Sequence, residues 1–267
     1  MDYKIIFSDI DGTLINDQHL VTPKTKDAIR QLNYNHCLFV PVSARMPEAI
    51  ETVTKQIGSG FPMICYNGAL VLDASQNVIA SFPMDQNVAM DVCRYVEKHL
   101  SRLAWNAYGH HQWLSQSHDR KFVEREESIV EVQSTPAIVD DIKDMEAVHK
   151  LLLMGAEEDI AQAADILTKQ YPQLSIVRSS KILLEIMNQG IRKGKAVELL
   201  SHHYSIPLSE TLSFGDNYND LDMLTTTGTA YVMGNAPEDI KQTIKNVTLD
   251  NNHDGIAQVL ITLKHID

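Results

Sequence analysis

The sequence predicts an α/β fold in which a doubly wound parallel sheet is interrupted by a large insertion. Short β-branched and aromatic runs alternate with amphipathic segments up to Tyr66, and the alternation resumes after Gly190. Buried strands that alternate with helices are typical of a parallel sheet with helices on both faces. Between these parts the pattern changes to mixed helix and strand. We therefore expect residues 1–82 and 190–267 to form one domain and residues 83–189 to form an inserted α+β domain.

The N-terminal segment contains clear start and stop signals for these elements. The apolar run Tyr3–Ser8 predicts a buried strand that opens into an acidic loop, and Thr22-Pro23 supplies a cap and a first-turn proline for a helix ending near Asn33. The elements expected next are a strand at Cys37–Val42, a helix from Pro47 to about Ile57, a strand at Met63–Tyr66 followed by a turn at Asn67-Gly68, and a hairpin of Ala69–Asp73 and Val78–Phe82.

The insertion and the C-terminal segment are assigned from the same periodicities. In the insertion we expect helices at Gln86–Leu100 and Glu157–Lys169 and strands at Leu103–Tyr108, Gln112–Ser115, Lys150–Met154, Ser175–Arg178 and Leu183–Met187. After it we expect a helix at Lys193–Tyr204, a strand at Thr211–Gly215, a helix at Asn219–Leu224, a strand at Thr229–Met233, and helices from Pro237 and from about Gly255.

The composition excludes several classes of partner. Hydrophobic residues make up 44% of the chain and charged residues 22%, which is typical of a globular protein. The 23 Lys and Arg residues against 35 Asp and Glu residues give a net charge of −12, which repels nucleic-acid backbones and anionic lipid headgroups. We therefore expect no nucleic-acid or membrane partner. A phosphorylated substrate would have to be neutralised locally, by a metal ion and a few cationic side chains.

The cysteines and the N-terminus indicate a reducing compartment. Cys37, Cys65 and Cys93 are widely spaced, lie in or beside apolar segments and form no metal-binding motif, so we expect buried free thiols. The first apolar run is too short and too acidic for a secretory signal, and no later stretch is long enough to span a bilayer. A cytoplasmic location fits best.

Two aspartates, Asp9 and Asp11, directly follow the first predicted strand. On an extended chain their side chains point to the same side, and Gly12 lets the chain turn sharply after them. Because Asp-Gly is common in turns, an ordinary strand-end turn is the alternative for this segment alone. A calcium-binding loop is excluded by spacing, since Leu14 stands where that loop needs glycine and Leu20 where it needs glutamate.

A second polar segment, Gly215–Asp220 (GDNYND), follows the apolar strand Leu212–Phe214. Its oxygen-bearing side chains suit a hard divalent cation, although the segment alone could also be a turn whose Asp216 or Asn219 caps the next helix. In a parallel sheet all carboxyl ends open on one edge, so Asp9, Asp11, Ser43, Asp216 and Asp220 should converge there. Clustered carboxylates repel one another unless a cation shares them. The combination therefore predicts a Mg²⁺ site.

Two further residues are candidates to hold a phosphate group. Lys193 begins a predicted helix, where a cation is unfavourable against the helix dipole unless an anion compensates it. A solvated surface lysine is the alternative. Ser43 ends the second strand, where it could donate a hydrogen bond to a phosphate oxygen or cap the following helix.

The motifs DIDGT, VSAR, RKGKA and GDNYND, in this order, resemble those of the haloacid dehalogenase-like hydrolase superfamily and specifically its Cof-type (subclass IIB) phosphatases. The segments at Tyr66–Ala69 (YNGA), Val232–Lys241 and Asn251–Ala257 are also similar to that subfamily, so the resemblance spans nearly the whole chain. It implies a Rossmann-like core whose insertion is a cap domain over the active site.

The resemblance also implies roles for individual residues. Asp9 would attack phosphorus and become an aspartyl-phosphate, while Asp11 would protonate the leaving oxygen and then activate the hydrolytic water. Ser43 and Lys193 would grip phosphate oxygens. Mg²⁺ would be bound by the side chains of Asp9 and Asp216 and the carbonyl of Asp11, with help from Asp220. The weaker assignments for phosphate or substrate binding are Gly12, Asn67, Gly68, Asn219 and Asn235.

Two details of the motifs differ or are ambiguous. Ala44 stands where many relatives have glycine, which leaves the role of Ser43 intact but restricts the backbone of its loop. Lys195 competes with Lys193, but the lysine before Gly194 matches the family pattern, and only one of the two can face the site from a helix.

The expected activity is hydrolysis of a small phosphorylated metabolite, such as a sugar phosphate, a nucleotide or a cofactor phosphate. Asp11 argues against an ion-pumping ATPase, which lacks the second aspartate. A phosphomutase is the enzymatic alternative, and a non-catalytic sugar-phosphate sensor is the other. Specificity is expected to lie in the insertion, where the candidates are His110, His111, Trp113, His118, Arg120 and Lys121.

Overall fold

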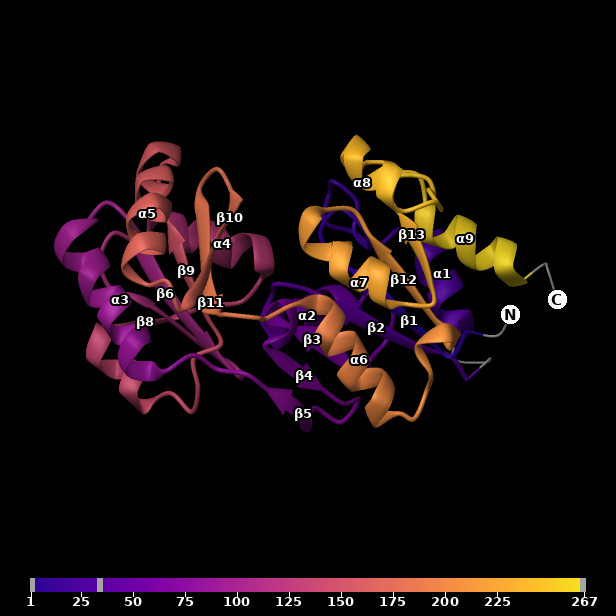
Figure 1. Cartoon of the computed structure of the whole chain (residues 1–267), viewed down its shortest axis with the longest axis horizontal. Helices are drawn as coiled ribbons and strands as arrows, with labels where there is room; N and C mark the ends of the chain where they lie inside the picture. Colours follow the sequence, from indigo (N-terminus) through magenta and orange to yellow (C-terminus); the bar gives the residue numbers. More distant parts are fainter. Residues whose placement is uncertain (1–2, 33–35, 265–267) are drawn as a thin grey trace. The chain divides into compact units, whose positions relative to one another are not determined.

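A computed structural model describes residues 3–32 and 36–264, and the predicted end of the first helix at Asn33 lies outside them. The chain divides into two compact units, each shown in Figure 1. The first unit comprises Met1–Arg45, Ile50–Ser81 and Arg192–Asp267, and the second comprises Met46–Ala49 and Phe82–Ile191. The described part of the chain has no helix with both the length and the hydrophobicity needed to cross a bilayer.

A seven-stranded sheet of order β13-β12-β1-β2-β3-β4-β5 forms the centre of the first unit. The first five strands in this order are parallel, and the last two add an antiparallel hairpin. The strands are β1 (Ile5–Asp9), β2 (Leu38–Val42), β3 (Met63–Cys65), β4 (Leu70–Leu72), β5 (Val78–Ser81), β12 (Thr211–Gly215) and β13 (Thr229–Val232). Because β1 lies between β12 and β2, the carboxyl ends of these three strands open on the same edge.

Helices cover this sheet by burying apolar side chains against it. They are α1 (Pro23–Leu32), α2 (Pro47–Thr54), α6 (Lys193–His203), α7 (Leu221–Thr226), α8 (Glu238–Thr243) and α9 (Gly255–Lys264). The helices α6 and α7 pack side by side (Figure 1), and Val197 and Leu200 of α6 share a core cluster with Phe7 and Val40 of the sheet. Burial of side chains of this size contributes about 1.5–3 kcal/mol each, so this contact holds α6 firmly over the sheet.

The second unit contains a six-stranded sheet of order β10-β11-β9-β6-β7-β8. Its strands are β6 (Ala104–Gly109), β7 (Gln112–Gln116), β8 (Thr135–Ala137), β9 (Lys150–Met154), β10 (Leu174–Ser180) and β11 (Leu183–Asn188), and its helices are α3 (Gln86–His99), α4 (Lys121–Val130) and α5 (Glu157–Gln170). Alternate residues of the central strands, such as Trp105 and Leu151, join α3 and α5 in one apolar core. The predicted α/β fold class, including a mixed α+β second part, is confirmed.

Four segments differ from the sequence prediction. The predicted strand at Met63–Tyr66 ends at Cys65, because Tyr66–Gly68 forms a 3-10 turn with positive φ angles of 51°, 54° and 105°. The predicted helix at Asn219–Leu224 is a 3-10 turn at Tyr218–Asp220 followed by α7. The helix α4 and the strand β8 were not predicted.

Helix α4 lacks the regular spacing of apolar residues that indicates a helix, because one of its inward positions is acidic. The side chain of Glu127 is buried, and its carboxylate accepts hydrogen bonds from the guanidinium of Arg120 at 2.7 Å and from the hydroxyl of Ser134 at 2.6 Å. These bonds hold the pKa of Glu127 below its ordinary value despite the opposing effect of burial. The buried carboxylate of Glu127 thus occupies a position where an apolar residue would have indicated the helix.

The buried imidazole of His149, next to β9, should make the second unit less stable in acid. Its Nδ1 accepts a hydrogen bond from the His110 amide at 3.2 Å, and burial, assisted by the charge of His110, lowers its pKa from 6.5 to about 4. The unfolded chain therefore binds a proton near pH 6.5 that the folded chain excludes until about pH 4. Stability should fall as pH drops through this window, by about 2 kcal/mol at pH 5.

The variant His149→Asn keeps an acceptor near the His110 amide without a titrating ring. Urea unfolding at pH 7 and pH 5 should show a smaller loss of free energy for this variant than for the wild type. The exposed His118, changed to Asn, serves as the control and should retain the wild-type difference. An unchanged pH dependence in His149→Asn would contradict the assignment.

Candidate active site

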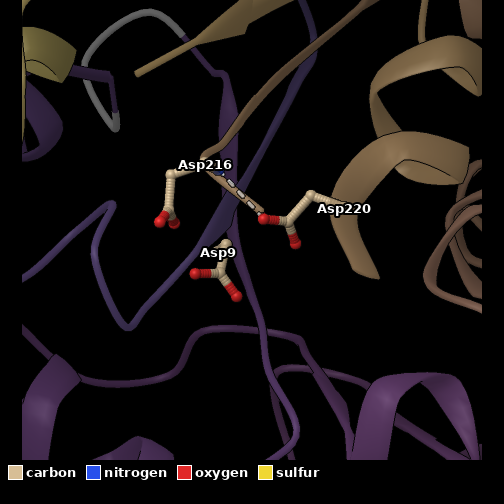
Figure 2. Close-up of side chains that lie close together, drawn as sticks. All are labelled: Asp9, Asp216 and Asp220. Carbon is tan, nitrogen blue, oxygen red and sulfur yellow. Dashed lines mark hydrogen bonds between the residues drawn. The ribbon is translucent and has the colours of Figure 1, made fainter. Parts of the chain in front are cut away.

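Three carboxylates from two strand ends meet at the carboxyl edge of the first sheet. Asp9 ends β1, while Asp216 and Asp220 follow β12, and one oxygen of each lies within 4.8 Å of the others. Figure 2 shows that the three side chains lie close together. Asp9 and Asp220 are buried and Asp216 is half-buried. Strands β1 and β12 are paired in parallel, which brings together residues more than 200 positions apart, as the 203-residue separation of Thr13 and Asp216 illustrates.

The ammonium group of Lys193 lies inside this acidic cluster. Its Nζ donates to Asp9 Oδ1 at 2.5 Å and to Asp220 Oδ1 at 2.7 Å, and the Lys193 side chain is only 1% exposed. Burial alone would lower the pKa of the ammonium, but the carboxylates of Asp220 and Asp9 outweigh it and raise this pKa. Lys193 is therefore charged. A lysine at the start of a helix was expected to need a nearby anion, and the carboxylates of Asp9 and Asp220 provide it.

Even with Lys193 present, the cluster holds excess negative charge. Burial, followed by the charge of Asp220, raises the pKa of Asp9 well above its ordinary value, although Lys193 acts in the opposite direction. Burial likewise raises the pKa of Asp216 to about 6, against a lowering hydrogen bond from Thr13. Raised pKa values mean that the site favours protons or another cation over bare carboxylates.

Gly12 and Thr13 hold Asp216 in place. Thr13 Oγ1 donates to Asp216 Oδ1 at 2.7 Å, and a Cβ at position 12 would lie 2.5 Å from Asp216 Oδ2. Gly12 also has a φ of +81°. Glycine is therefore required at this position both by the turn and by the close approach of the Asp216 carboxylate. The amide of Asn235 donates to the Gly12 carbonyl at 2.8 Å and to Asp216 Oδ2 at 3.3 Å, which ties the loop after β13 to the same site.

Asp220 and Asp222 organise the segment after β12. The Oδ2 of Asp220 accepts hydrogen bonds from the amides of Asp216 and Asn217, both at 3.0 Å, so one carboxylate fixes the loop and binds Lys193. Asp222 Oδ2 accepts the Gly194 amide at 2.8 Å. Amides in the first turn of a helix have no partner within that helix. The hydrogen bond from the Gly194 amide to Asp222 therefore stabilises the first turn of α6 and fixes the backbone that carries Lys193.

Ser43 and the turn Tyr66–Gly68 lie at the adjacent strand ends. Ser43 is buried directly after β2, and its Oγ accepts the Arg45 amide at 3.2 Å, so it caps its own loop in this state. The Asn67 amide donates to the Ser43 carbonyl at 2.9 Å. Gly68, with φ of +105°, packs so close to the Arg192 carbonyl that a Cβ would lie 2.7 Å from it. The turn is therefore fitted to the start of α6.

The carboxylate of Asp11 is not part of the three-aspartate cluster. It forms a two-point ion pair with Arg45, in which Nε donates to Oδ2 at 2.9 Å and Nη2 to Oδ1 at 2.6 Å. Among the remaining predicted residues, Asn219 is exposed, and Lys195 is exposed whereas Lys193 is buried. In the second unit, Trp113 is buried against Tyr108 and bonded to Asn106, while Arg120 forms the ion pair with Glu127.

Sequence reasoning missed Thr13, Arg45 and Asp222 as parts of the site. Thr13 and Arg45 stand within the DIDGT and VSAR motifs, so their presence in a motif was the available signal. Asp222 has no such signal, because its contact with Gly194 depends on how α6 and α7 pack.

The donor set fits a hard divalent cation. Three carboxylate oxygens within 4.8 Å of one another, with raised pKa values at Asp9 and Asp216, are the ligand type that Mg²⁺ prefers. Among the described residues, Asp9, Asp216 and Asp220 form the one group of three or more Asp, Glu, His or Cys side chains whose possible ligand atoms lie this close together.

A family model for haloacid dehalogenase-like hydrolases matches residues 6–260. The chain belongs to this family. It is 35% identical over 260 residues to a Haemophilus influenzae protein assigned by name to the phosphatases, covering 97% of this chain and 98% of the relative. The resemblance found in the motifs is confirmed, and with it the identity of the chain as a phosphatase-class hydrolase.

Solved structures share the fold of this chain. The crystal structure of a Thermotoga maritima protein matches with a TM-score of 0.88 at 30% identity, covering 97% of both chains. The subclass IIB sugar phosphatase of the same superfamily matches with a TM-score of 0.81 at 22% identity, covering 98% of this chain and 99% of that one. At 22% identity the second comparison supports the fold alone.

Proposed function

We propose that this family member is a Mg²⁺-dependent phosphatase that hydrolyses a small phosphorylated metabolite through an aspartyl-phosphate on Asp9. The observation that carries the proposal is the buried cluster in which Asp9 shares Lys193 with Asp220 while Asp216 stands within 4.8 Å. We further propose that residues 1–82 and 190–267 act as the catalytic core and residues 83–189 as the cap.

In the first half of the reaction, a carboxylate oxygen of Asp9 attacks phosphorus as the bond to the leaving oxygen breaks. Asp11 gives its proton to that leaving oxygen. Lys193 has its ammonium 2.5 Å from Asp9, so it is placed to bind an oxygen of the phosphoryl group that Asp9 attacks. The hydroxyl of Ser43 would turn from its backbone contact to bind a second oxygen.

In the second half, Asp11 takes a proton from a water molecule that attacks phosphorus, and the bond to Asp9 breaks. Mg²⁺, when held by Asp9, Asp216 and the Asp11 carbonyl with support from Asp220, supplies neutralisation of the charge on the transferred group. Asn67, Gly68, Asn219 and Asn235 complete the proposed phosphate and substrate contacts, together with Gly12.

The test is the release of inorganic phosphate from an aryl phosphate with and without Mg²⁺. Chelation by EDTA should abolish release, and added Mg²⁺ should restore it. Asp216→Asn should raise the Mg²⁺ concentration for half-maximal rate by roughly tenfold or more, because a carboxylate ligand is lost. Calorimetric Mg²⁺ titration should show the same weakening. Asp165→Asn, at an exposed position on α5, should match the wild type. Full activity in EDTA would overturn the metal requirement.

A further inference from the structure

The ion pair between Arg45 and Asp11 is the feature of this site that the proposed mechanism leaves unused. Both carboxylate oxygens of Asp11 accept a hydrogen bond from the same guanidinium, at 2.9 and 2.6 Å. In the described part of the chain the structure gives the Asp11 carboxylate no other hydrogen bond. Two parallel donors from one plane fix the orientation of a carboxylate, which a single donor does not.

The guanidinium is presented from a constrained backbone. The Arg45 amide donates to Ser43 Oγ at 3.2 Å, and its carbonyl accepts the Tyr66 amide at 3.1 Å. The Arg45 side chain is 10% exposed, whereas that of Asp11 is 54% exposed. A half-buried, anchored arginine therefore holds a carboxylate that would otherwise be free to rotate in water.

We propose that Arg45 is a positioning residue that orients Asp11 for proton transfer. This inference rests on the proposed acid/base role of Asp11. The two-point contact suits the ionised carboxylate, which exists after Asp11 has given its proton to the leaving group and before it takes one from the attacking water. When Asp11 receives that proton on one oxygen, Arg45 keeps its bond to the other, so the side chain stays in its orientation between the two half-reactions.

The inference predicts a dependence on the leaving group. A poor leaving group such as the alkoxide of glycerol phosphate needs protonation, whereas 2,4-dinitrophenolate leaves without it. The ratio kcat/KM reports the step in which the leaving group departs. We expect Arg45→Met to lower kcat/KM roughly 10- to 100-fold for glycerol phosphate, because this loss is a part of the rate enhancement that general acid catalysis supplies. The same variant should change kcat/KM little for 2,4-dinitrophenyl phosphate.

Asp11→Asn provides the matching comparison. It should show the same selectivity with a larger loss, and adding Arg45→Met to it should cause no further loss, because Arg45 acts through Asp11. Arg45→Lys keeps the charge without the planar pair of donors and should remain impaired. Arg94→Met removes an arginine–aspartate contact of equal length, 2.6 Å to Asp140 in the second unit, and should match the wild type on both substrates.

The outcomes separate this inference from the proposed function. Equal losses on both substrates, multiplicative losses in the double variant, or full rescue by Arg45→Lys would each overturn the positioning role of Arg45. If Asp11→Asn itself lacks leaving-group selectivity, the acid/base role fails and the inference falls with it. If Asp9→Asn retains full turnover, the proposed nucleophile fails.

Discussion

Replacing Asp9 with asparagine should lower the rate of phosphate release by roughly 10⁴-fold or more, because the amide oxygen is a very poor nucleophile toward phosphorus. The substitution is nearly isosteric, and the amide oxygen can still accept the hydrogen bond from Lys193, which is 2.5 Å from the carboxylate in the wild type. We therefore expect the fold to survive while turnover is lost.

Steady-state release of phosphate and acid-quench trapping of the phosphorylated protein check this result. The wild type should yield an acid-stable label from a radioactive phosphate ester, and Asp9→Asn should yield none. Asp140→Asn, which changes an exposed carboxylate paired with Arg94, is the matched control and should behave as the wild type. Unchanged turnover in Asp9→Asn would overturn the nucleophile assignment.

The second large effect is expected from Lys193→Met. Removing the ammonium leaves Asp9 and Asp220 facing each other in a buried site, and an uncompensated buried charge typically costs about 3–5 kcal/mol of stability. Mg²⁺ should restore part of this loss, since a divalent cation neutralises the same carboxylates. Activity should remain low with Mg²⁺ because the proposed phosphate contact is missing.

Urea unfolding of Lys193→Met with Mg²⁺ and with EDTA measures this effect. The double variant Lys193→Met with Asp220→Asn removes one charge of each sign and should recover part of the stability in EDTA. Lys195→Met changes the exposed lysine two residues along α6 and should unfold as the wild type does. A loss that neither Mg²⁺ nor the second substitution reduces would show that packing, rather than charge, is the role of Lys193.

Most of the sheet was predictable because its strands are short apolar runs that end in polar turns. The predictions for Lys150–Met154 and Thr211–Gly215 coincide with β9 and β12, since these strands are buried along their whole length. The predicted turn at Asn67-Gly68 is present, but the strand before it was extended one residue too far, because Tyr66 is aromatic. The three successive positive φ angles at Tyr66–Gly68 depend on contacts with the start of α6, which no local pattern shows. Helix α4 was missed because Glu127 occupies an inward position.

The convergence of the strand-end carboxylates was predictable from topology. A doubly wound sheet places Asp9 and Asp216 on one edge, and the structure brings their oxygens within 4.8 Å. The position of each side chain within that edge was not predictable. Asp11 turns to Arg45, and Asp222 reaches Gly194, through packing between segments that no local pattern relates.

The central position of β1 has a consequence for synthesis of the protein on the ribosome. Its partner β2 follows within the first 42 residues, but its other neighbour, β12, emerges only after the entire second unit. That unit is contiguous from Phe82 to Ile191 apart from a four-residue segment, so it can acquire its own core while β1 still has one open edge. Asp9 consequently meets its C-terminal counterparts late, because the three-aspartate cluster cannot form before Asp216 and Asp220 have been translated.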